Sequence, residues 1–552
     1  MLNSRRLGGA CRRSQAATTI APNRSGRVIL EKEGDSDKLK RWTKFVAIGL
    51  LGLATLTPGA VAFSQSSPPS DAVTVESLKF TETYGAIQSN FADPVDPDAV
   101  VLDGGIRGML SALDPFCSFF DRDQFEMLKQ QTRGEALGFG SILYVTPGKI
   151  LVLQTAQNSP SARAGLGPGD EIVEINGTRV NRVDFQTLVD LLRRSRSHPV
   201  RLGVIHPGRD VAQDYDLKPA EVALPSVDRS FVLSPGIGYI HLSSFEEKTP
   251  QEVLDAVVKL ATAPLEGLVL DLRDNHGGVV DAAIGVASLF LKPEALVMTM
   301  RGRASPEKPY RTARAPKQFD VPIVVLVNGD TASAAEVLAS ALQEHDRAVI
   351  AGGPTYGKGV VQSVTPLSED TGLALTTAQY FTPSGRSLQR PLAGTALASP
   401  GKELDPASTS SHFSTDDGRP LSPGGGIAPD VEIPPRALDP WVSFLDQAGA
   451  FTDYASEYLT LHGRSNRSFD PDAAMLEDFR DYLTRRGIRT PVEFWGIDQD
   501  YLKLRIKVEL LNLVYGLSSG EEAETKGDPQ VQTAATLFAK IPQILKGPLT
   551  KR

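Results

Sequence analysis

The chain has 552 residues, which is more than a single domain usually holds. Its 41% hydrophobic and 22% charged residues are ordinary for globular protein, so the length predicts several folded units. The net charge is −8, but residues 1–62 carry 11 basic and only 4 acidic side chains, so the rest of the chain has a net charge of −15. The remaining body is therefore acidic, which argues against general nucleic-acid binding.

An export signal is predicted near the amino end. The basic stretch 38–44 precedes Phe45–Phe63, which holds no charge, and residues 60–62 (Ala-Val-Ala) match an Ala-x-Ala cleavage pattern. The apolar run is nearly long enough to span a bilayer, so an uncleaved signal would anchor the chain in the inner membrane. The acidic residues in 31–37 argue against an organelle transit peptide. We expect the rest of the chain to lie in the periplasm or cell envelope.

The two cysteines, Cys11 and Cys117, lie on opposite sides of this apolar segment, so no internal disulfide is expected. No histidine pattern accompanies Cys117, and we interpret it as a helix-packing residue rather than a nucleophile. No metal-ligand spacing occurs either. The sequence therefore predicts no metal and no cofactor.

Residues 64–133 are predicted to be helical, and a separate β-rich unit is predicted at 134–218. Its expected elements are strands at 141–145, 150–153 and 171–175 and an amphipathic helix at 185–192. A Pro147-Gly148 turn separates the first two strands, and Asn176-Gly177 is a hairpin signal after the third.

This order of elements resembles a PDZ domain. Such domains add an extended peptide to a sheet edge and capture its terminal carboxylate with backbone N–H groups. The resemblance places the carboxylate cradle in the loop that precedes the first strand. Its residues are Leu137, Gly138, Phe139 and Gly140.

Three predicted strands of the next unit each end in a glycine-containing loop. They cover 268–273, 323–327 and 348–353, and the first is followed by Asp274-Asn275-His276-Gly277-Gly278. Paired glycines at a strand's carboxyl end leave bare N–H groups, at the edge where open α/β sheets place ligands.

Ser333 lies near the start of a predicted helix, 332–342, that follows the second of these strands. Helix N-termini carry unpaired N–H groups and a positive dipole, which suits a nucleophile beside an oxyanion site. Taken alone, a serine at this position is more often only a helix cap.

Lys358 lies between Gly357 and Gly359, where the backbone is free to approach another group closely. An exposed turn lysine and a phosphate-binding lysine are the alternatives. The P-loop pattern is incomplete, because Gly359 stands where it requires Ser or Thr. Gln362, four residues on, is placed to hold the lysine amine by a hydrogen bond.

The carboxyl-terminal part divides into a polar stretch and a helical extension. Residues 391–423 are rich in Ser, Pro, Gly and Asp and are predicted to be a surface insertion. The extension 435–552 is predicted to form helices at 441–458, 473–486, 499–515 and 531–545. Packing on the core, building a homodimer and recruiting an adaptor are its candidate roles.

Several of these segments together resemble the C-terminal processing peptidases, also called tail-specific proteases. The three catalytic-looking segments are 268–278, 327–336 and 355–362. Further matches lie at 108–115, 236–245, 380–387 and 426–431. The resemblance covers roughly residues 76–434, and the order of so many motifs makes it specific.

The resemblance assigns a role to each candidate site residue. It implies Ser333 as nucleophile, Lys358 as general base and Gln362 as the residue that orients the lysine. The N–H of Ala334, with that of Gly277 or Gly278, would form the oxyanion hole. Three departures from the family pattern are Asp330, Ala335 and His276, of which His276 lies in the oxyanion loop.

The implied fold is a multidomain α/β protein. A mixed-sheet Ser–Lys protease core (219–434) follows the inserted PDZ domain, with helical segments before and after and an amino-terminal extension at 1–63. The implied function is a serine endopeptidase that recognises protein or peptide substrates by their free C-termini and cleaves through an acyl-enzyme. A catalytically silent PDZ scaffold, a non-peptidase acyl hydrolase, and a Ser-His-Asp triad using His276 or His345 are the alternatives.

Overall fold

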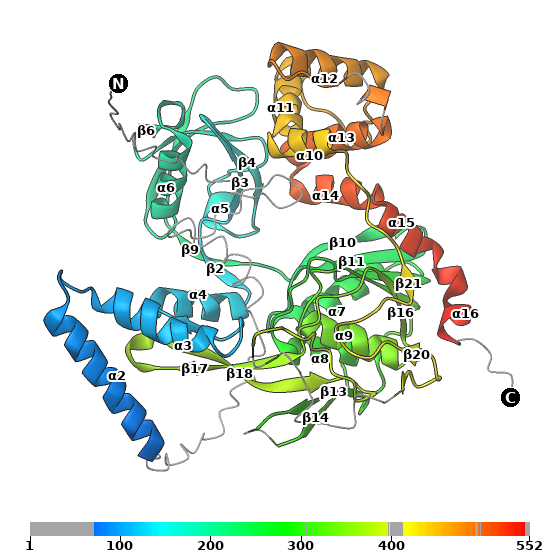
Figure 1. The fold of residues 1–552 in the computed structure, drawn as a ribbon. Helices are drawn as coiled ribbons and strands as arrows, with labels where there is room; N and C mark the ends of the chain where they lie inside the picture. Colours follow the sequence, from blue (N-terminus) through cyan, green and yellow to red (C-terminus); the bar gives the residue numbers. More distant parts are fainter. Residues whose placement is uncertain are drawn as a thin grey trace, which may run out of the picture.

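A computed structural model describes residues 71–303, 306–395, 397, 412–491, 495–496 and 498–546 (Figure 1). The predicted export signal and Cys11 lie outside these residues. Within the described ranges, no helix is both long and apolar enough to cross a membrane. The architecture is mixed α/β, as the sequence predicts, with a central α/β core, a β-rich domain beside it, and helices at both ends.

A six-stranded sheet forms the centre of the core, in the order β10-β11-β12-β15-β16-β21. Its strands are β10 (Val227–Ser234), β11 (Ile237–Leu242), β12 (Gly267–Asp271), β15 (Ile323–Val327), β16 (Ala348–Gly352) and β21 (Val431–Glu432). All neighbours are parallel except β10 and β11. The predicted first core strand is thus preceded by an antiparallel edge strand that the sequence analysis missed.

Helices cover both faces of this sheet. On one face lie α7 (Thr249–Leu260), α8 (Val280–Phe290) and α9 (Ala334–Glu344), which pack on alternate strand residues such as Leu270 and Val325. On the other face, residues such as Tyr239 and Val324 pack against α15 (Pro529–Thr536) and α16 (Ile541–Leu545). The carboxyl-terminal extension therefore covers one face of the central sheet (Figure 1).

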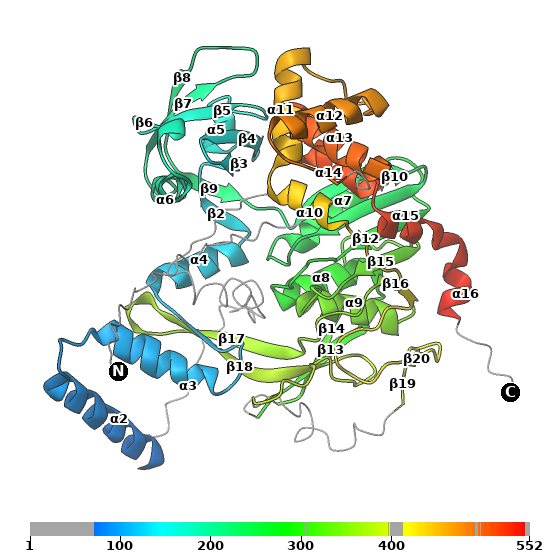
Figure 2. The same ribbon diagram turned by 45° about the horizontal axis from the view of Figure 1, so that its top comes forward.

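A second sheet lies below the first, in the order β1-β18-β13-β14, with β17 paired to β18. Its strands are β1 (Ser118–Phe120), β13 (Leu296–Arg301), β14 (Lys308–Arg311), β17 (Val360–Pro366) and β18 (Gly372–Phe381). In Figure 2, β17 and β18 form a long arm that reaches the amino-terminal helices. Strand β1 lies within the predicted helical segment 64–133, so that prediction was incomplete.

The β-rich domain contains a sheet ordered β3-β4-β5-β7-β8, with β6 (Thr178–Arg179) paired to β5. Its strands are β3 (Ser141–Thr146), β4 (Lys149–Thr155), β5 (Glu171–Ile175), β7 (Val200–Ile205) and β8 (Gln213–Leu217). Two helices, α5 (Pro160–Arg163) and α6 (Phe185–Ser195), belong to it. Strand β3 is an edge of the sheet. A ladder of β2 (Glu135–Gly138) with β9 (Ala220–Ala223) joins the domain to the core.

The amino-terminal segment contains α2 (Asp71–Asn90), a π-helical stretch (Asp98–Ile106), α3 (Arg107–Ser111) and α4 (Arg122–Thr132). Helix α2 has no buried residue. Cys117 lies between α3 and β1, where its Sγ accepts a hydrogen bond from the N–H of Thr376 (3.5 Å). It is buried and packs with Leu110 of α3, as predicted, and also with Phe119 of β1.

The extension also packs on the β-rich domain. Its first helices are α10 (Pro440–Gln447), α11 (Ala450–His462), α12 (Ala473–Arg485), α13 (Gln499–Tyr515) and α14 (Leu517–Lys526). They share an apolar cluster with Tyr144, Leu151 and Leu153 of β3 and β4. The predicted helix 441–458 is two helices, because Gly449 adopts a left-handed conformation (φ 68°). The predicted helix 531–545 is likewise interrupted, by a 3-10 turn at Phe538–Lys540.

The stretch 391–423 is not simply a surface insertion. Leu397 is buried and packs on Phe116 and Val360. Arg419, between β19 (Phe413–Ser414) and β20 (Pro420–Leu421), is also buried and forms ion pairs with Asp346 and Asp430. Residues 396 and 398–411 of this stretch lie outside the described ranges.

Candidate active site

The predicted nucleophile and base lie on loops at one edge of the central sheet. Strands β12, β15 and β16 are parallel, so the loops that follow them meet at their carboxyl ends. These three loops carry Gly277-Gly278, Ser333 and Lys358, respectively. The topology therefore brings together residues that are up to 81 positions apart in the sequence, as a Ser–Lys site requires.

Ser333 adopts a strained backbone conformation, with φ 57° and ψ −120°. A non-glycine residue in such a region costs about 1–3 kcal/mol and persists only where the surroundings hold it, commonly at functional sites. Ser333 occupies the N-cap position of α9, yet its fully buried Oγ has no hydrogen-bond partner among the described residues. The hydroxyl is thus not used as a helix cap, which is the role that its position alone favours.

One carboxylate joins the nucleophile loop to the base loop. Glu336 Oε2 accepts hydrogen bonds from the backbone N–H of Ser333 (2.9 Å) and of Lys358 (2.8 Å). Its Oε1 accepts from the N–H of Gly357 (2.8 Å) and from the Thr355 hydroxyl. Burial raises the pKa of Glu336, and these four hydrogen bonds oppose the shift. Glu336 has no role in the sequence-based assignment, although an acid three residues after an N-cap is a recognisable capping signal.

Lys358 is fully buried, and its Nζ donates to Gln362 Oε1 (3.3 Å). Burial lowers the pKa of Lys358 to about 7, although the carboxylates of Asp114 and Glu336 favour its charged form. A lysine amine is a useful general base only when its pKa approaches the working pH. The structure therefore supplies the desolvation that a lysine base needs, and it places Gln362 where the sequence predicts it.

The glycine loop approaches the nucleophile so closely that a side chain would not fit. A Cβ on Gly277 would lie 2.8 Å from Ser333 Cβ and 2.9 Å from Ala334 N. The N–H of Gly277 donates to Asn275 Oδ1 (2.8 Å), whereas those of Gly278 and Ala334 have no partner within the described ranges. Of the two glycines, Gly278 is the one with an N–H available to an oxyanion.

No histidine supports the alternative of a Ser-His-Asp triad. The His276 ring bonds to the carbonyl of Asp330 (3.2 Å). His345 bonds to Asp416 and to the carbonyl of Leu296. Since Ser333 Oγ has no hydrogen-bond partner in the described part of the chain, neither ring is placed as its base here.

The predicted carboxylate cradle is divided between a strand and a loop. Leu137 and Gly138 belong to β2 and pair with β9, and the Leu137 carbonyl also accepts from Arg196 Nε (3.2 Å). Phe139 and Gly140 form the turn into β3, and their N–H groups have no partner among the described residues. These two free donors lie at the start of the open edge of β3, where an added peptide strand would end.

Two further side chains lie near the site without a role in the sequence-based assignment. Phe116 lies with its ring centroid 4.3 Å from Lys358 Nζ. Tyr380 is buried, and its hydroxyl has no hydrogen-bond partner in the described ranges. Burial raises the pKa of Tyr380, and the nearby Ser333 hydroxyl lowers it in part. Phe116 lies far in sequence from all three loops, so only the fold reveals its proximity.

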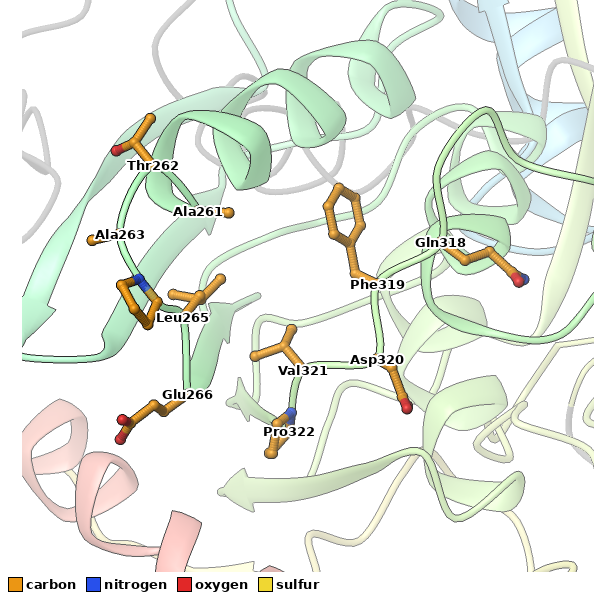
Figure 3. Close-up of a pocket in the computed structure, with 11 residues that line it drawn as sticks. Ala261, Thr262, Ala263, Leu265, Glu266, Gln318, Phe319, Asp320, Val321 and Pro322 are labelled. Carbon is orange, nitrogen blue, oxygen red and sulfur yellow. The ribbon is translucent and has the colours of Figure 1, made fainter.

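A cavity of about 570 Å³ lies away from this site. It is lined by residues 261–266 and 318–322, the loops that precede β12 and β15 (Figure 3). These loops are at the amino ends of the strands, opposite the edge that carries Ser333. No candidate catalytic residue lines this cavity.

Two parts of this chain match known protein families. Residues 236–396 match the model of peptidase family S41, and residues 151–205 match that of the PDZ domain. A carboxy-terminal-processing protease of Bartonella bacilliformis is 35% identical over 316 residues, covering 56% of this chain and 72% of the relative. A carboxyl-terminal-processing protease of Synechocystis sp. is 34% identical, covering 52% of this chain and 68% of that relative.

Among solved structures, the photosystem II D1 C-terminal processing protease is 28% identical. The match covers 65% of this chain and 86% of that one, with a TM-score of 0.35. The sequence relatives carry the assignment, because they are similar over most of their own length. The chain belongs to the C-terminal processing peptidase family, whose members are PDZ-containing serine-type peptidases of family S41.

Proposed function

We propose that this protein is an endopeptidase that cleaves protein substrates with Ser333 as nucleophile and Lys358 as general base. The observation that carries the proposal is the shared Glu336 oxygen, which holds the backbones of both residues at the carboxyl edge of the sheet. In addition, burial lowers the pKa of Lys358 to about 7. A hydroxyl without a partner and a desolvated amine are what a Ser–Lys pair requires.

The proposed reaction has two halves. Neutral Lys358 takes the proton of Ser333 Oγ as the oxygen attacks the scissile carbonyl, and the N–H groups of Ala334 and Gly278 stabilise the oxyanion. The protonated lysine then donates to the leaving amine, which leaves an acyl-enzyme that water hydrolyses with Lys358 again as base. Gln362 orients the amine throughout.

We propose further that the PDZ domain selects substrates by a free C-terminus. The last residues of the substrate would add to the open edge of β3, and the terminal carboxylate would bind the N–H groups of Phe139 and Gly140. A carboxylate accepts such bonds more strongly than an amide oxygen does, which gives the preference for an unmodified end.

The compartment is also a proposal. The basic stretch 38–44 and the uncharged Phe45–Phe63 support export to the periplasm or cell envelope, with inner-membrane attachment if the signal is retained. Fractionation of cells that produce the full chain, with protease protection of the folded body, tests this expectation.

Purified full-length protein, as wild type and as Ser333→Ala and Lys358→Ala, tests the chemistry. Each is incubated with an unfolded protein whose apolar C-terminus is either free or amidated. We expect wild type to cleave the free form faster by about tenfold or more, and both variants to lose at least a thousandfold in rate.

The outcomes separate the alternatives. Cleavage by both variants would show that the dyad is wrong, and equal rates on the two substrates would remove carboxylate recognition. A wild type that hydrolyses small esters but no protein would be an acyl hydrolase. One that binds the free C-terminus without hydrolysing either substrate would be a scaffold.

A further inference from the structure

A segment of the amino-terminal region reaches the base lysine from outside the protease core. Asp114–Cys117 connects α3 to β1, and the buried Phe116 ring lies with its centroid 4.3 Å from Lys358 Nζ. Asp114 Oδ1 accepts from the N–H of Phe116 (2.8 Å) and of Cys117 (3.0 Å), which fixes the turn that aims the ring. The base is therefore covered by a residue far from the catalytic loops in sequence.

The ring is held in place from both sides. Immediately after it, β1 pairs with β18, where Ser118 lies opposite Ala374. Around it, Val360, Leu397, Tyr356 and Leu392 form an apolar cluster with Phe116. This packing holds the face of the Phe116 ring against Lys358 Nζ.

An aromatic ring over an amine has two opposite effects on its proton affinity. Its bulk excludes water and so disfavours the ammonium form, whereas its π face attracts the cation. The charged groups that act on Lys358 are the carboxylates of Asp114, beside the ring, and Glu336, on α9, and both favour the ammonium. Gln362 is neutral, and burial raises the pKa of Tyr356, which keeps that neighbour uncharged.

We propose that Phe116 is a positioning residue of the catalytic base. Its ring covers Nζ, keeps the amine directed toward Gln362, and sets the proton affinity of the base through exclusion of water and contact with its π face. This inference rests on the proposed Ser–Lys chemistry. It gives the amino-terminal segment a part in the reaction beyond support of the fold.

Two substitutions at Phe116 separate the effects of bulk and π face. Phe116→Leu keeps an apolar cover but removes the π face, so the ammonium is less stable and the base works at lower pH. Phe116→Ala admits water, so the base is charged up to higher pH. Phe119→Leu is the matched control, since Phe119 is buried on β1 and packs on Leu110 and Cys117 instead.

The readout is the pH dependence of Ser333 labelling by a fluorophosphonate, measured on the full chain, because the reagent requires no PDZ contact. In Phe116→Leu, we expect the acid limb of the rate profile to shift to lower pH by roughly 0.5–1.5 pH units. It should shift to higher pH in Phe116→Ala and keep its position in Phe119→Leu. Asp114→Asn keeps the acceptor for the turn but removes a negative charge that favours the ammonium form. The acid limb should therefore also shift to lower pH in this variant.

Each result decides between the possibilities. The proposal would be overturned if the Phe116 variants lower only the plateau rate while Asp114→Asn still shifts the acid limb. The ring would then have a structural role only. An upward shift in Phe116→Leu would overturn it as well. If Phe116→Ala does not fold, the Leu variant and its control still decide. Wild-type labelling in Lys358→Ala would instead contradict the dyad itself.

Discussion

The two regions that would handle substrate differ in how they present their polar groups. In the PDZ domain, Phe139 and Gly140 are partly exposed with free N–H groups, and Ile142 on the edge strand is 38% exposed. In the protease core, Ser333 and Lys358 are completely buried. The free donors of the first region are open to a peptide end, whereas the side chains of Ser333 and Lys358 are closed off from solvent. Under the proposed function, recognition of a peptide end would come before a scissile bond reaches Ser333.

The same contrast appears in what maintains each region. The peptide loop depends on local backbone geometry, a positive φ at Gly140 and a short strand ladder. The proposed catalytic pair depends on a buried carboxylate, a desolvated amine and a strained serine, all of which cost stability. Substitutions in the two regions should therefore affect different quantities.

Outside the Ser333–Lys358 pair itself, the largest effect is expected at Glu336. Glu336→Gln replaces one carboxylate oxygen by an NH₂ group that faces backbone donors, so the nucleophile and base loops lose their shared acceptor. We expect kcat to fall about 10²–10³-fold, as misplacement of catalytic groups by an ångström does. Glu344→Gln is the control, because it removes a buried carboxylate on the same helix that pairs with Arg386 instead. Equal losses of kcat in both variants would show that Glu336 acts only through stability.

The next effect concerns stability. Lys358→Met should raise the free energy of unfolding by about 2–4 kcal/mol near pH 7, because it removes a buried amine whose pKa is lowered to about 7. A lowered pKa means that the unfolded chain binds more protons between pH 7 and the ordinary lysine range. The penalty in the wild type is therefore complete below about pH 7 and fades as the pH rises toward 10.

Denaturant unfolding of wild type and Lys358→Met at pH 6.5 and pH 9.5 checks this sign. The gain should be larger at the lower pH. A gain that is equal at both values, or larger at pH 9.5, would contradict a desolvated lysine.

The smallest effect is expected in the peptide loop. A Cβ at Gly140 would lie 2.3 Å from Ser159 Cβ, so Gly140→Ala should displace the Phe139–Gly140 donors. We expect KM for substrates with a free C-terminus to rise about tenfold, a loss of roughly 1.4 kcal/mol. The rate of Ser333 labelling should not change. Gly148→Ala is the matched control in the same domain, with a similar φ of 79° and no atom within 3.4 Å of the added carbon.

Local motifs account for what the sequence predicted well. Strand β15 and helix α13 have the bounds that their residue patterns indicate, and the loops that carry Ser333 and Lys358 follow predicted strands. Gln362 lies four residues after Lys358, at the start of β17, and accepts a hydrogen bond from its amine. Each of these features is encoded within a few neighbouring residues.

Long-range packing accounts for the features that the sequence did not predict. Nothing around Phe116 indicates that its ring would lie on a lysine that is 242 positions later in the chain. The two terminal helices α15 and α16 close one face of the core sheet, although their own sequence shows only that they are helical. Arg273, in the loop after β12, forms an ion pair with Asp528 of the extension (Nη1 to Oδ2, 2.7 Å), which no local pattern predicts either. Such contacts follow from the assembled topology rather than from local pattern.

The most direct test of the central claim is the rate of Ser333 labelling by a fluorophosphonate as a function of pH, in wild type and in Lys358→Ala. If Lys358 activates Ser333, the wild-type rate should rise about tenfold per pH unit and level off above about pH 7, where the amine is neutral. Lys358→Ala should be slower by at least a hundredfold at the plateau, with no inflection near pH 7. Labelling of Lys358→Ala at the wild-type rate would contradict the account.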